Sequence, residues 1–323
     1  MNTAAAPDRS SSAARGGPAI PGPRERAGDR FFRWVITGFA ALILVVTLAL
    51  AWQLTQGSLK TWAAFGPKFL WTSTWDPVNE VFGALPFLYG TLVSSFIALL
   101  VAVPLGVGSA IFLAELAPRR ISNAISFAIE LLAAVPSVIL GLMGIFILVP
   151  AVRAAEPFLG RWLGFLPFFR GAPYGVGLLA AGLILSLMIL PYITSITREV
   201  LLTVPRPLKE GMYALGATRW EMVRAVSLPY ARSGIFGAIF LSLGRALGET
   251  MAVTMVIGNT PRISASLFAP SYSMAAVIAN ELAEAASDAH LSALIAVGLV
   301  LLGVTVLING LARLMIYRVE GRR

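Results

Sequence analysis

The sequence contains no cysteine and only one histidine, His290, among its 323 residues. Disulfides and cysteine-ligated metals are therefore excluded, and a histidine-based metal site would need more than one imidazole. Charged residues are also scarce, at 13%, whereas 57% of the residues are hydrophobic and the mean hydropathy is +0.80. Because no soluble core needs so much apolar surface, the composition indicates an all-α protein that crosses a membrane several times.

The sequence also lacks a nucleotide-binding motif. No G-x-x-x-x-G-K-[ST] occurs, and none of the three lysines, Lys60, Lys68 and Lys209, lies in a glycine-rich loop that opens a helix. We therefore do not expect this chain to hydrolyse ATP. It offers no Ser/His, Cys/His or paired-acid arrangement at catalytic spacing, so a membrane-embedded enzyme is disfavoured. No catalytic residue, metal or cofactor is expected.

Long apolar segments predict six transmembrane helices. The expected spans are Phe31–Leu54, Pro86–Leu116, Ile121–Val149, Gly175–Thr197, Tyr230–Gly258 and Leu291–Ile316. Pro191 is expected to break the fourth span. In the third span, residues 133–137 (AAVPS) are followed by Gly141 and Gly144. This pattern favours close helix packing, with a gating kink as the alternative.

The N-terminal region differs in composition from the rest of the chain. Residues 1–29 contain four prolines, four glycines and few large apolar side chains, which predicts a disordered cytoplasmic tail. Its alternative role is binding of anionic lipids through basic residues, namely Arg24, Arg26, Arg30 and Arg33. Residues 30–85 are expected to hold the first span and an external segment on the membrane surface, and residues 86–323 the other five spans. The first span is too long for a typical signal-peptide core, so we expect it to be retained.

Lysine and arginine are unevenly divided between the two sides of the membrane that these spans define. If the N-terminus is cytoplasmic, the cytoplasmic segments carry 18 basic residues and the external segments carry six, with Arg245 inside the fifth span. Basic residues collect in the cytoplasmic loops of membrane proteins. Both termini are therefore expected in the cytoplasm, together with the charged segment between the fourth and fifth spans.

This charged segment, residues 205–229, is expected to form a compact cytoplasmic loop. Two short helices, 208–215 and 218–226, are predicted on either side of an elbow at Gly216, and Pro229 is expected to open the next span. Each helix carries an apolar stripe, with Leu208, Met212 and Leu215 on the first and Trp220 and Val223 on the second. These residues alone leave two alternatives open: a loop on the lipid surface, or a knob that docks into a partner protein.

The spacing within this loop is specific. Glu210 is followed by Gly216 in the pattern E-x-x-x-x-x-G, and after eleven further residues by Leu228-Pro229. The pattern resembles the EAA loop of permease subunits of bacterial ABC importers, the binding-protein-dependent transport superfamily. Gly211 and Met212 replace the two alanines of that pattern. The resemblance implies docking on a cytoplasmic ATPase through Glu210, Leu215, Gly216, Trp220 and Pro229.

Two other segments resemble the permeases of the high-affinity phosphate importer. These are residues 130–144 and residues 245–259 (RALGETMAVTMVIGN), and the second is more similar to the PstC type than to the companion PstA type. The resemblance implies a five-helix permease core, a PstA-like second permease subunit, a PstB-like ATPase dimer and a PstS-like external phosphate-binding protein, with no nucleic acid partner. The binding protein would deliver its cargo to residues 71–81 and 259–290. Related permeases carry many solutes, so another oxyanion remains an alternative.

Arg245 and Glu249 place charge midway along the predicted fifth span. Four residues apart, they would share one face of a continuous helix and pair. An ionised group near the bilayer centre costs about 2.5–3.5 kcal/mol, so it is retained only where it faces protein, water or an opposite charge. Because a guanidinium matches phosphate oxygens, we expect the substrate path here, with Glu249 holding Arg245 until phosphate competes for it. The alternative is an ion pair that fixes packing, and Glu130 is expected to be structural.

The residues thus favour a permease subunit that is driven by a separate ATPase. An ion-coupled secondary carrier or channel is the alternative class, since it too would place charge in the middle of the membrane. The two classes differ in one measurable property. A carrier would transport when reconstituted alone with an ion gradient, whereas a permease subunit would be inert without its ATPase.

Overall fold

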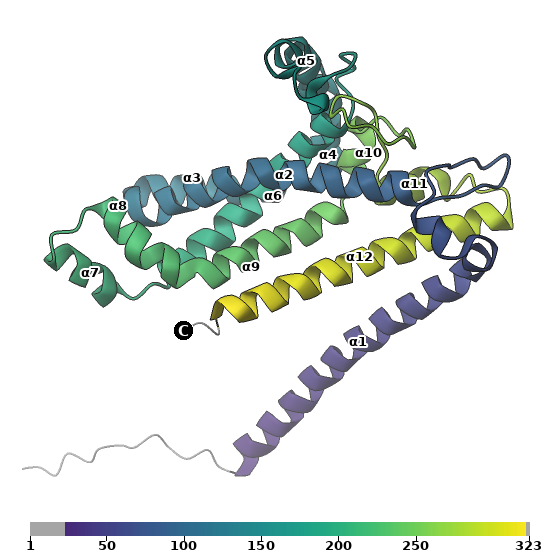
Figure 1. Cartoon of the computed structure of the whole chain (residues 1–323). Helices are drawn as coiled ribbons and strands as arrows, with labels where there is room; N and C mark the ends of the chain where they lie inside the picture. Colours follow the sequence, from purple (N-terminus) through teal and green to yellow (C-terminus); the bar gives the residue numbers. More distant parts are fainter. Residues whose placement is uncertain (1–22, 321–323) are drawn as a thin grey trace, which may run out of the picture. The chain divides into compact units, whose positions relative to one another are not determined.

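The computed structural model describes residues 23–320, with side chains from 28 to 318. The described residues are helical apart from loops and one isolated antiparallel bridge between Asp76 and Val81 (Figure 1). Helix α1 begins at Pro23, so residues 23–29 of the predicted tail are helical, and residues 1–22 lie outside the described part. Contacts divide the chain after Trp52, within α1, into two units.

The helices follow one another with short connections. Their bounds are α1 (Pro23–Phe65), α2 (Leu85–Ile111), α3 (Arg119–Ala133), α4 (Ser137–Met143), α5 (Val149–Leu163), α6 (Leu178–Leu202), α7 (Arg206–Ala214), α8 (Arg219–Met222), α9 (Leu228–Leu247), α10 (Met251–Val256), α11 (Met274–Glu281) and α12 (Asp288–Glu320). Three π-helical turns extend or join them: η2 (Phe112–Leu116) after α2, η3 (Gly144–Leu148) between α4 and α5, and η5 (Val223–Ser227) between α8 and α9. Two 3₁₀ turns are η1 (Gly66–Leu70) and η4 (Pro167–Phe169).

Six helical stretches among the described residues are long and apolar enough to cross a membrane, which confirms the predicted number. They are Gly28–Leu70, Leu85–Leu116, Ser137–Leu163, Leu178–Leu202, Arg219–Leu247 and Asp288–Arg318. The predicted break of the fourth span at Pro191 is wrong, because α6 continues through this proline. Pro191 is buried where α6 packs against its neighbours, and that packing keeps the helix continuous despite the missing N–H donor.

Both the predicted third span, for which a kink was the alternative, and the predicted fifth span are broken. Helix α3 ends at Ala133 and α4 begins at Ser137, because Pro136 cannot donate a helical hydrogen bond and the residue before it avoids the helical conformation. Helix α9 ends at Leu247, with Gly248 as its C-cap, and α10 begins only at Met251.

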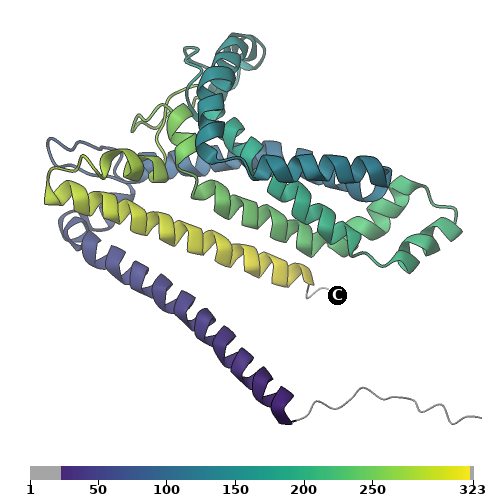
Figure 2. The same cartoon turned by 180° about the vertical axis from the view of Figure 1, so that it is seen from behind.

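Residues 150–173, which lie between the predicted third and fourth spans, contain most of α5 and the turn η4. Helix α5 stands apart from the bundle of α2, α6, α9 and α12, with its axis at a steep angle to those helices (Figures 1 and 2). Its buried side chains, Val152 and Glu156, lie one helical turn apart and therefore face the protein together. The segment contains four prolines, yet two of them, Pro150 and Pro157, are accommodated in the helix.

The centre of the second unit is the contact between α2 and α6. Small residues such as Ala98, Ala102 and Ala181 are fully buried there. A Cβ added at Gly182 would lie 2.4 Å from Cγ2 of Ile97, so the two backbones approach closely. Helices α7 and α8 lie at one end of this bundle and α11 lies at the other (Figure 1).

A second core lies at the end of the bundle where α11 is found. The external segment, residues 53–85, was expected on the membrane surface, but Phe69 and Phe82 are fully buried against α11 and the first turns of α12. Trp71, in contrast, is exposed. Only part of this aromatic segment is therefore available to a membrane surface, because most of its rings pack inside the protein.

Candidate functional site

Arg245 lies in the last turn of α9, and its guanidinium faces an aromatic ring. Its Cζ is 4.4 Å from the centroid of the Tyr192 ring, a cation–π contact. Along α6, Tyr192 is about 21 Å from Leu178 and about 15 Å from Leu202 at 1.5 Å per residue, which places the contact near the middle of this span. The side chain of Arg245 is exposed on the surface of the single chain.

The predicted pair between Arg245 and Glu249 is wrong. Among the described residues, no ion pair joins them, because α9 ends at Leu247 and the i, i+4 geometry is lost at the break. Glu249 instead turns toward the next helix, where its Oε1 accepts a 3.4 Å hydrogen bond from the N–H of Ala252. Both side chains remain at the break between α9 and α10.

The two broken spans meet beside this contact, because α4 packs directly on α10. A Cβ at Gly141 would lie 2.5 Å from Sδ of Met255 and 3.1 Å from Cα of Ala252, so this contact depends on glycine. Gly144 makes a similar approach to Val256. The helical stretch that begins with α4 has N–H groups in its first turn without acceptors inside the helix, and such groups favour an anion. Two helix breaks, the start of α4 and a guanidinium thus share one region.

Gly141→Leu is expected to lower the free energy of unfolding by about 1–3 kcal/mol, because the added side chain must displace α10 from α4. Gly108→Leu is the matched control, since a Cβ at Gly108 meets nothing within 4 Å. Thermal unfolding of the two purified variants in the same detergent makes the comparison. Equal melting temperatures would contradict the close packing of α4 and α10.

The structure of residues 205–229 confirms the predicted two helices and elbow. Helix α7 ends before Gly216, whose φ of +83° is a conformation that glycine adopts readily, and α8 follows. Thr218 caps α8 and forms a reciprocal capping box with Glu221, a T-x-x-E signal that is present in the sequence. Pro229 does not open a new helix, because α8, η5 and α9 run as one helical stretch from Arg219 to Leu247.

Apolar side chains project from this loop into solvent. Leu215 is 84% exposed and Trp220 is 61% exposed, and Leu208 and Tyr213 are also exposed. Glu210, Gly216 and Pro229, the other residues predicted to couple to a partner, lie at the surface as well. We call Leu208, Tyr213, Leu215 and Trp220 the loop patch. A cluster of this kind marks a site of contact with another protein or a membrane.

A buried carboxylate fastens the loop to the end of α2. Lys209 of α7 forms a 2.7 Å ion pair with Oε1 of Glu115 in η2, and the hydroxyl of Ser227 donates to the same oxygen at 2.8 Å. The side chain of Glu115 is only 5% exposed. This latch was not found from the sequence, where the only signals were an acid at the end of a span and a single lysine in the loop. It makes α7, η2 and η5 one connected block.

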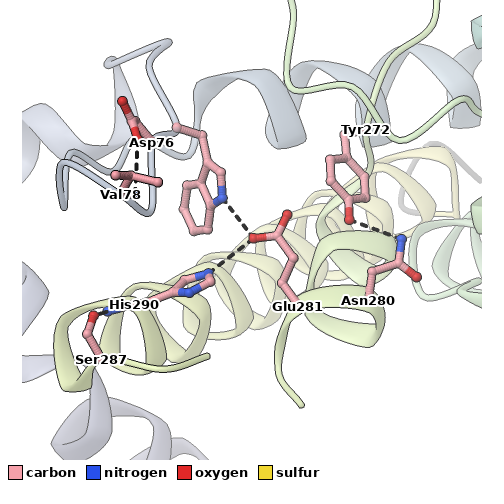
Figure 3. Close-up of polar contacts among 8 residues, drawn as sticks. Asp76, Val78, Tyr272, Asn280, Glu281, Ser287 and His290 are labelled. Carbon is pink, nitrogen blue, oxygen red and sulfur yellow. Dashed lines mark hydrogen bonds and ion pairs between the residues drawn. The ribbon is translucent and has the colours of Figure 1, made fainter. Parts of the chain in front are cut away.

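A polar cluster joins the two external segments that were predicted to receive cargo. Nε1 of Trp75 donates a 2.9 Å hydrogen bond to Oε2 of Glu281, and Nε2 of His290 lies 3.1 Å from the same oxygen. Figure 3 shows the side chains of Glu281 and His290 converging in this cluster. The His290 ring also stacks on Phe82 at 5.5 Å. The single histidine thus stabilises the packing of residues 71–82 on α11 and α12.

Two further groups shape this external region. Burial raises the pKa of Tyr272 to about 12, so its hydroxyl is neutral at physiological pH and accepts a 3.0 Å hydrogen bond from Asn280 (Figure 3). The carboxylate of Asp76 accepts hydrogen bonds from Asn79 and from the N–H of Val78, and the bond from the Asn79 side chain contributes most to lowering the pKa of Asp76. The resulting tight turn leaves Val78 projecting into solvent.

Comparison with known proteins places this chain in a family. Residues 102–321 match the family described as "Binding-protein-dependent transport system inner membrane component". The "Phosphate transport system permease protein PstC" of Mesorhizobium japonicum is 47% identical over 316 residues, covering 94% of this chain and 97% of that protein. The protein of the same name from Pasteurella multocida is 47% identical over 297 residues, covering 90% of this chain and 92% of that protein.

A more distant relative and a solved structure extend the comparison. "PstC 2" of Mycobacterium tuberculosis is 38% identical over 296 residues, covering 89% of this chain and 91% of that protein. An inward-facing structure of the MetNI methionine ABC transporter aligns with a TM-score of 0.49 at 21% identity, covering 72% of this chain and 93% of that one. By the family match and the relatives, the chain belongs to the binding-protein-dependent transport system inner membrane components, in the group whose members are named PstC.

Proposed function

We propose that this chain is the permease subunit of an ATP-driven phosphate importer in the bacterial inner membrane. The relatives named PstC support this function. The observation that carries it is the exposure of Arg245 on a spanning helix of the single chain. An arginine facing lipid at that depth would cost about 2.5–3.5 kcal/mol, so this face borders an aqueous path. As a permease the chain is not itself an enzyme, and a separate ATPase supplies the energy.

The path is shared with a second permease subunit, and Arg245 binds phosphate there. Its guanidinium offers parallel donors that match two phosphate oxygens. Tyr192 holds the guanidinium through a contact worth about 0.5–2 kcal/mol, weak enough for an anion to displace it. Weak binding suits a conduit, since a tight site would trap its cargo. Glu249, at the same break, accepts a hydrogen bond from a phosphate hydroxyl, which sulfate lacks.

Coupling passes through the cytoplasmic loop. The loop patch docks into the ATPase. The latch of Glu115, Lys209 and Ser227 keeps the loop fixed to the end of α2 while the ATPase moves the loop. From Arg219 the helix runs unbroken for 29 residues to Leu247, so a displacement of α8 reaches the turn that holds Arg245. No flexible linker separates the docking surface from the substrate site.

The partners follow from this arrangement. A PstA-like subunit completes the path, a PstB-like ATPase dimer binds the loop patch, and a PstS-like protein delivers phosphate to the external region of residues 71–81 and 259–290. Both termini lie in the cytoplasm, as the distribution of basic residues predicts. The same arrangement accommodates another oxyanion, so the substrate is a matter for measurement.

Co-purification in mild detergent tests the proposed function. We expect the chain to bring an ATPase subunit with it, and we expect the ATPase rate of the reconstituted complex to rise when loaded phosphate-binding protein is added. Sulfate at the same concentration is the control. Phosphate transport by this chain alone, driven by an ion gradient, would instead establish a secondary carrier.

Leu215→Asp and Trp220→Ala are each expected to weaken ATPase binding by at least about tenfold, because exposed anchors of this kind dominate interface energies. Folding should be unaffected, since neither side chain is buried. Trp71→Ala is the matched control, an equally exposed aromatic residue in the external segment. Co-purified ATPase per permease is the measurement, and equal yields for the loop and control variants would contradict docking at the loop patch.

A further inference from the structure

Helix α5 has two faces of different character. On the inner face, the buried Glu156 accepts a 3.0 Å hydrogen bond from the N–H of Gly175 and so ties α5 to the segment before α6. On the outer face, Phe158 and Trp162 are 63% and 71% exposed, with their ring centroids 6.1 Å apart. Phe165 continues this exposed aromatic surface beyond the end of the helix. The bundle therefore leaves the aromatic face of α5 uncovered.

Positive charge accompanies these rings. Residues 149–173 contain three arginines, Arg153, Arg161 and Arg170, and one acid, the buried Glu156. Arg161 and Arg170 both line a cavity beneath the C-terminal end of α5, together with Glu156, Phe169 and Phe268. Nε of Arg170 donates a 2.7 Å hydrogen bond to the carbonyl of Gly164, which fixes one side of this cavity. Nη2 of Arg170 also donates to the carbonyl of Phe165 at 3.3 Å, so Arg161 is the lining arginine suited to contact a phosphate group.

The direction of α5 indicates what covers its exposed aromatic face. The stretch Ser137–Leu163 is long and apolar enough to cross a membrane, but α5, its second half, leaves the bundle at a steep angle to α2, α9 and α12 in both views (Figures 1 and 2). Helix α5 therefore does not run along the direction in which those three helices cross. Its first turns contact the segment that leads into α6, because a Cβ at Gly175 would lie 2.7 Å from both Cβ of Arg153 and the carbonyl of Val149. A helix that leaves the bundle beside the start of α6, and that runs perpendicular to the spanning helices, lies parallel to the membrane surface. Aromatic rings and arginines are the residues that stabilise a helix there.

We infer that α5 is an in-plane anchor that binds anionic phospholipid on the outer leaflet of the membrane. Phe158 and Trp162 enter the boundary between headgroups and acyl chains, while Arg161 contacts a lipid phosphate at the mouth of the cavity. The anchor fixes the height of the loop that leads into α6 relative to the lipid surface. It belongs to this chain alone and does not depend on phosphate transport.

The absence of cysteine allows a direct test. Trp162→Cys and, as a second variant, Phe158→Cys each receive a fluorescent label in the full chain, purified with its accompanying subunits and reconstituted with a headgroup-proximal quencher lipid. Val78→Cys, at the exposed tip of the external turn, is the control. We expect quenching at positions 158 and 162 to exceed that at position 78 by about threefold or more, as interfacial aromatics should.

Lipid charge provides the second measurement. Adding phosphatidylglycerol to phosphatidylcholine vesicles should increase quenching at position 162, and Arg161→Gln should remove much of this increase. Quenching equal to that at position 78 would overturn the inference. Weak quenching together with cross-linking of the position-162 label to another subunit would overturn it as well, and would identify α5 as a protein interface.

Discussion

Arg245→Ala is expected to lower ATP-dependent phosphate uptake by about 100-fold, because two charge-assisted hydrogen bonds to phosphate, each worth about 1.5 kcal/mol, are lost. Arg245→Lys should fall between the wild type and Arg245→Ala, since an ammonium keeps the charge but cannot form two parallel bonds. Initial uptake of labelled phosphate into proteoliposomes measures the effect. Because Arg245 is exposed and forms no ion pair among the described residues, its removal should lower the free energy of unfolding by no more than its contact with Tyr192 contributes, about 0.5–2 kcal/mol.

Variants of Tyr192 separate a specific role of the ring from a general loss of packing. Tyr192→Phe keeps the contact at 4.4 Å and should retain most of the uptake, whereas Tyr192→Leu releases the guanidinium and should change the apparent affinity for phosphate.

Glu249→Gln should weaken discrimination between phosphate and sulfate. Normal uptake by Arg245→Ala at normal membrane abundance would exclude this site from the path.

Lys209→Met is expected to lower the free energy of unfolding by about 3 kcal/mol, because it leaves the buried carboxylate of Glu115 without its counter-charge. The double variant Glu115→Gln with Lys209→Met should recover much of this loss, since neither charge then remains. Thermal unfolding of the single and double variants gives the coupling energy. We also expect Lys209→Met to uncouple the complex, so that ATP hydrolysis continues while uptake falls.

Lys60→Met is the matched control for the latch. Lys60 and Asp288 form a 2.6 Å ion pair, but their side chains are 66% and 82% exposed. A pair so open to water contributes little to stability, so its loss should be small. If Lys60→Met and Lys209→Met lowered the free energy of unfolding equally, the burial of Glu115 would not explain the effect of Lys209→Met. The latch would then have no special importance for stability.

Apolar length predicted the membrane helices well, whereas their continuity depended on packing that the sequence does not display. Pro136 and Pro191 illustrate the difference, because both lie in apolar segments of similar composition. Pro191 is buried within α6, which continues through it, whereas Pro136 is exposed and separates α3 from α4. A local rule about proline could not distinguish the two positions, because tertiary contacts decide whether the helix continues.

In the candidate site, too, some features could be predicted from the sequence and others depend on the fold. The energetic cost of a charge within a span singled out Arg245, which stays a prediction as a site residue, but its contact with Tyr192 could not be inferred, because the i, i+4 rule fails once α9 ends at Leu247. The latch was beyond sequence analysis for another reason. Lys209 and Glu115 lie 94 residues apart, and only the fold brings them together. The T-x-x-E capping box, in contrast, was a local signal that could have been recognised.

The unbroken helix from Arg219 to Leu247 spans about 43 Å at 1.5 Å per residue, with the loop patch near one end and Arg245 near the other. Under the proposed function, two ligands therefore act on one rigid element. Thermodynamic linkage then requires that phosphate at Arg245 change the affinity for the ATPase by the same factor by which the docked ATPase changes the affinity for phosphate. The substrate is thus an effector of assembly as well as cargo, and an importer starved of phosphate should hold its ATPase with a different strength from one that is saturated.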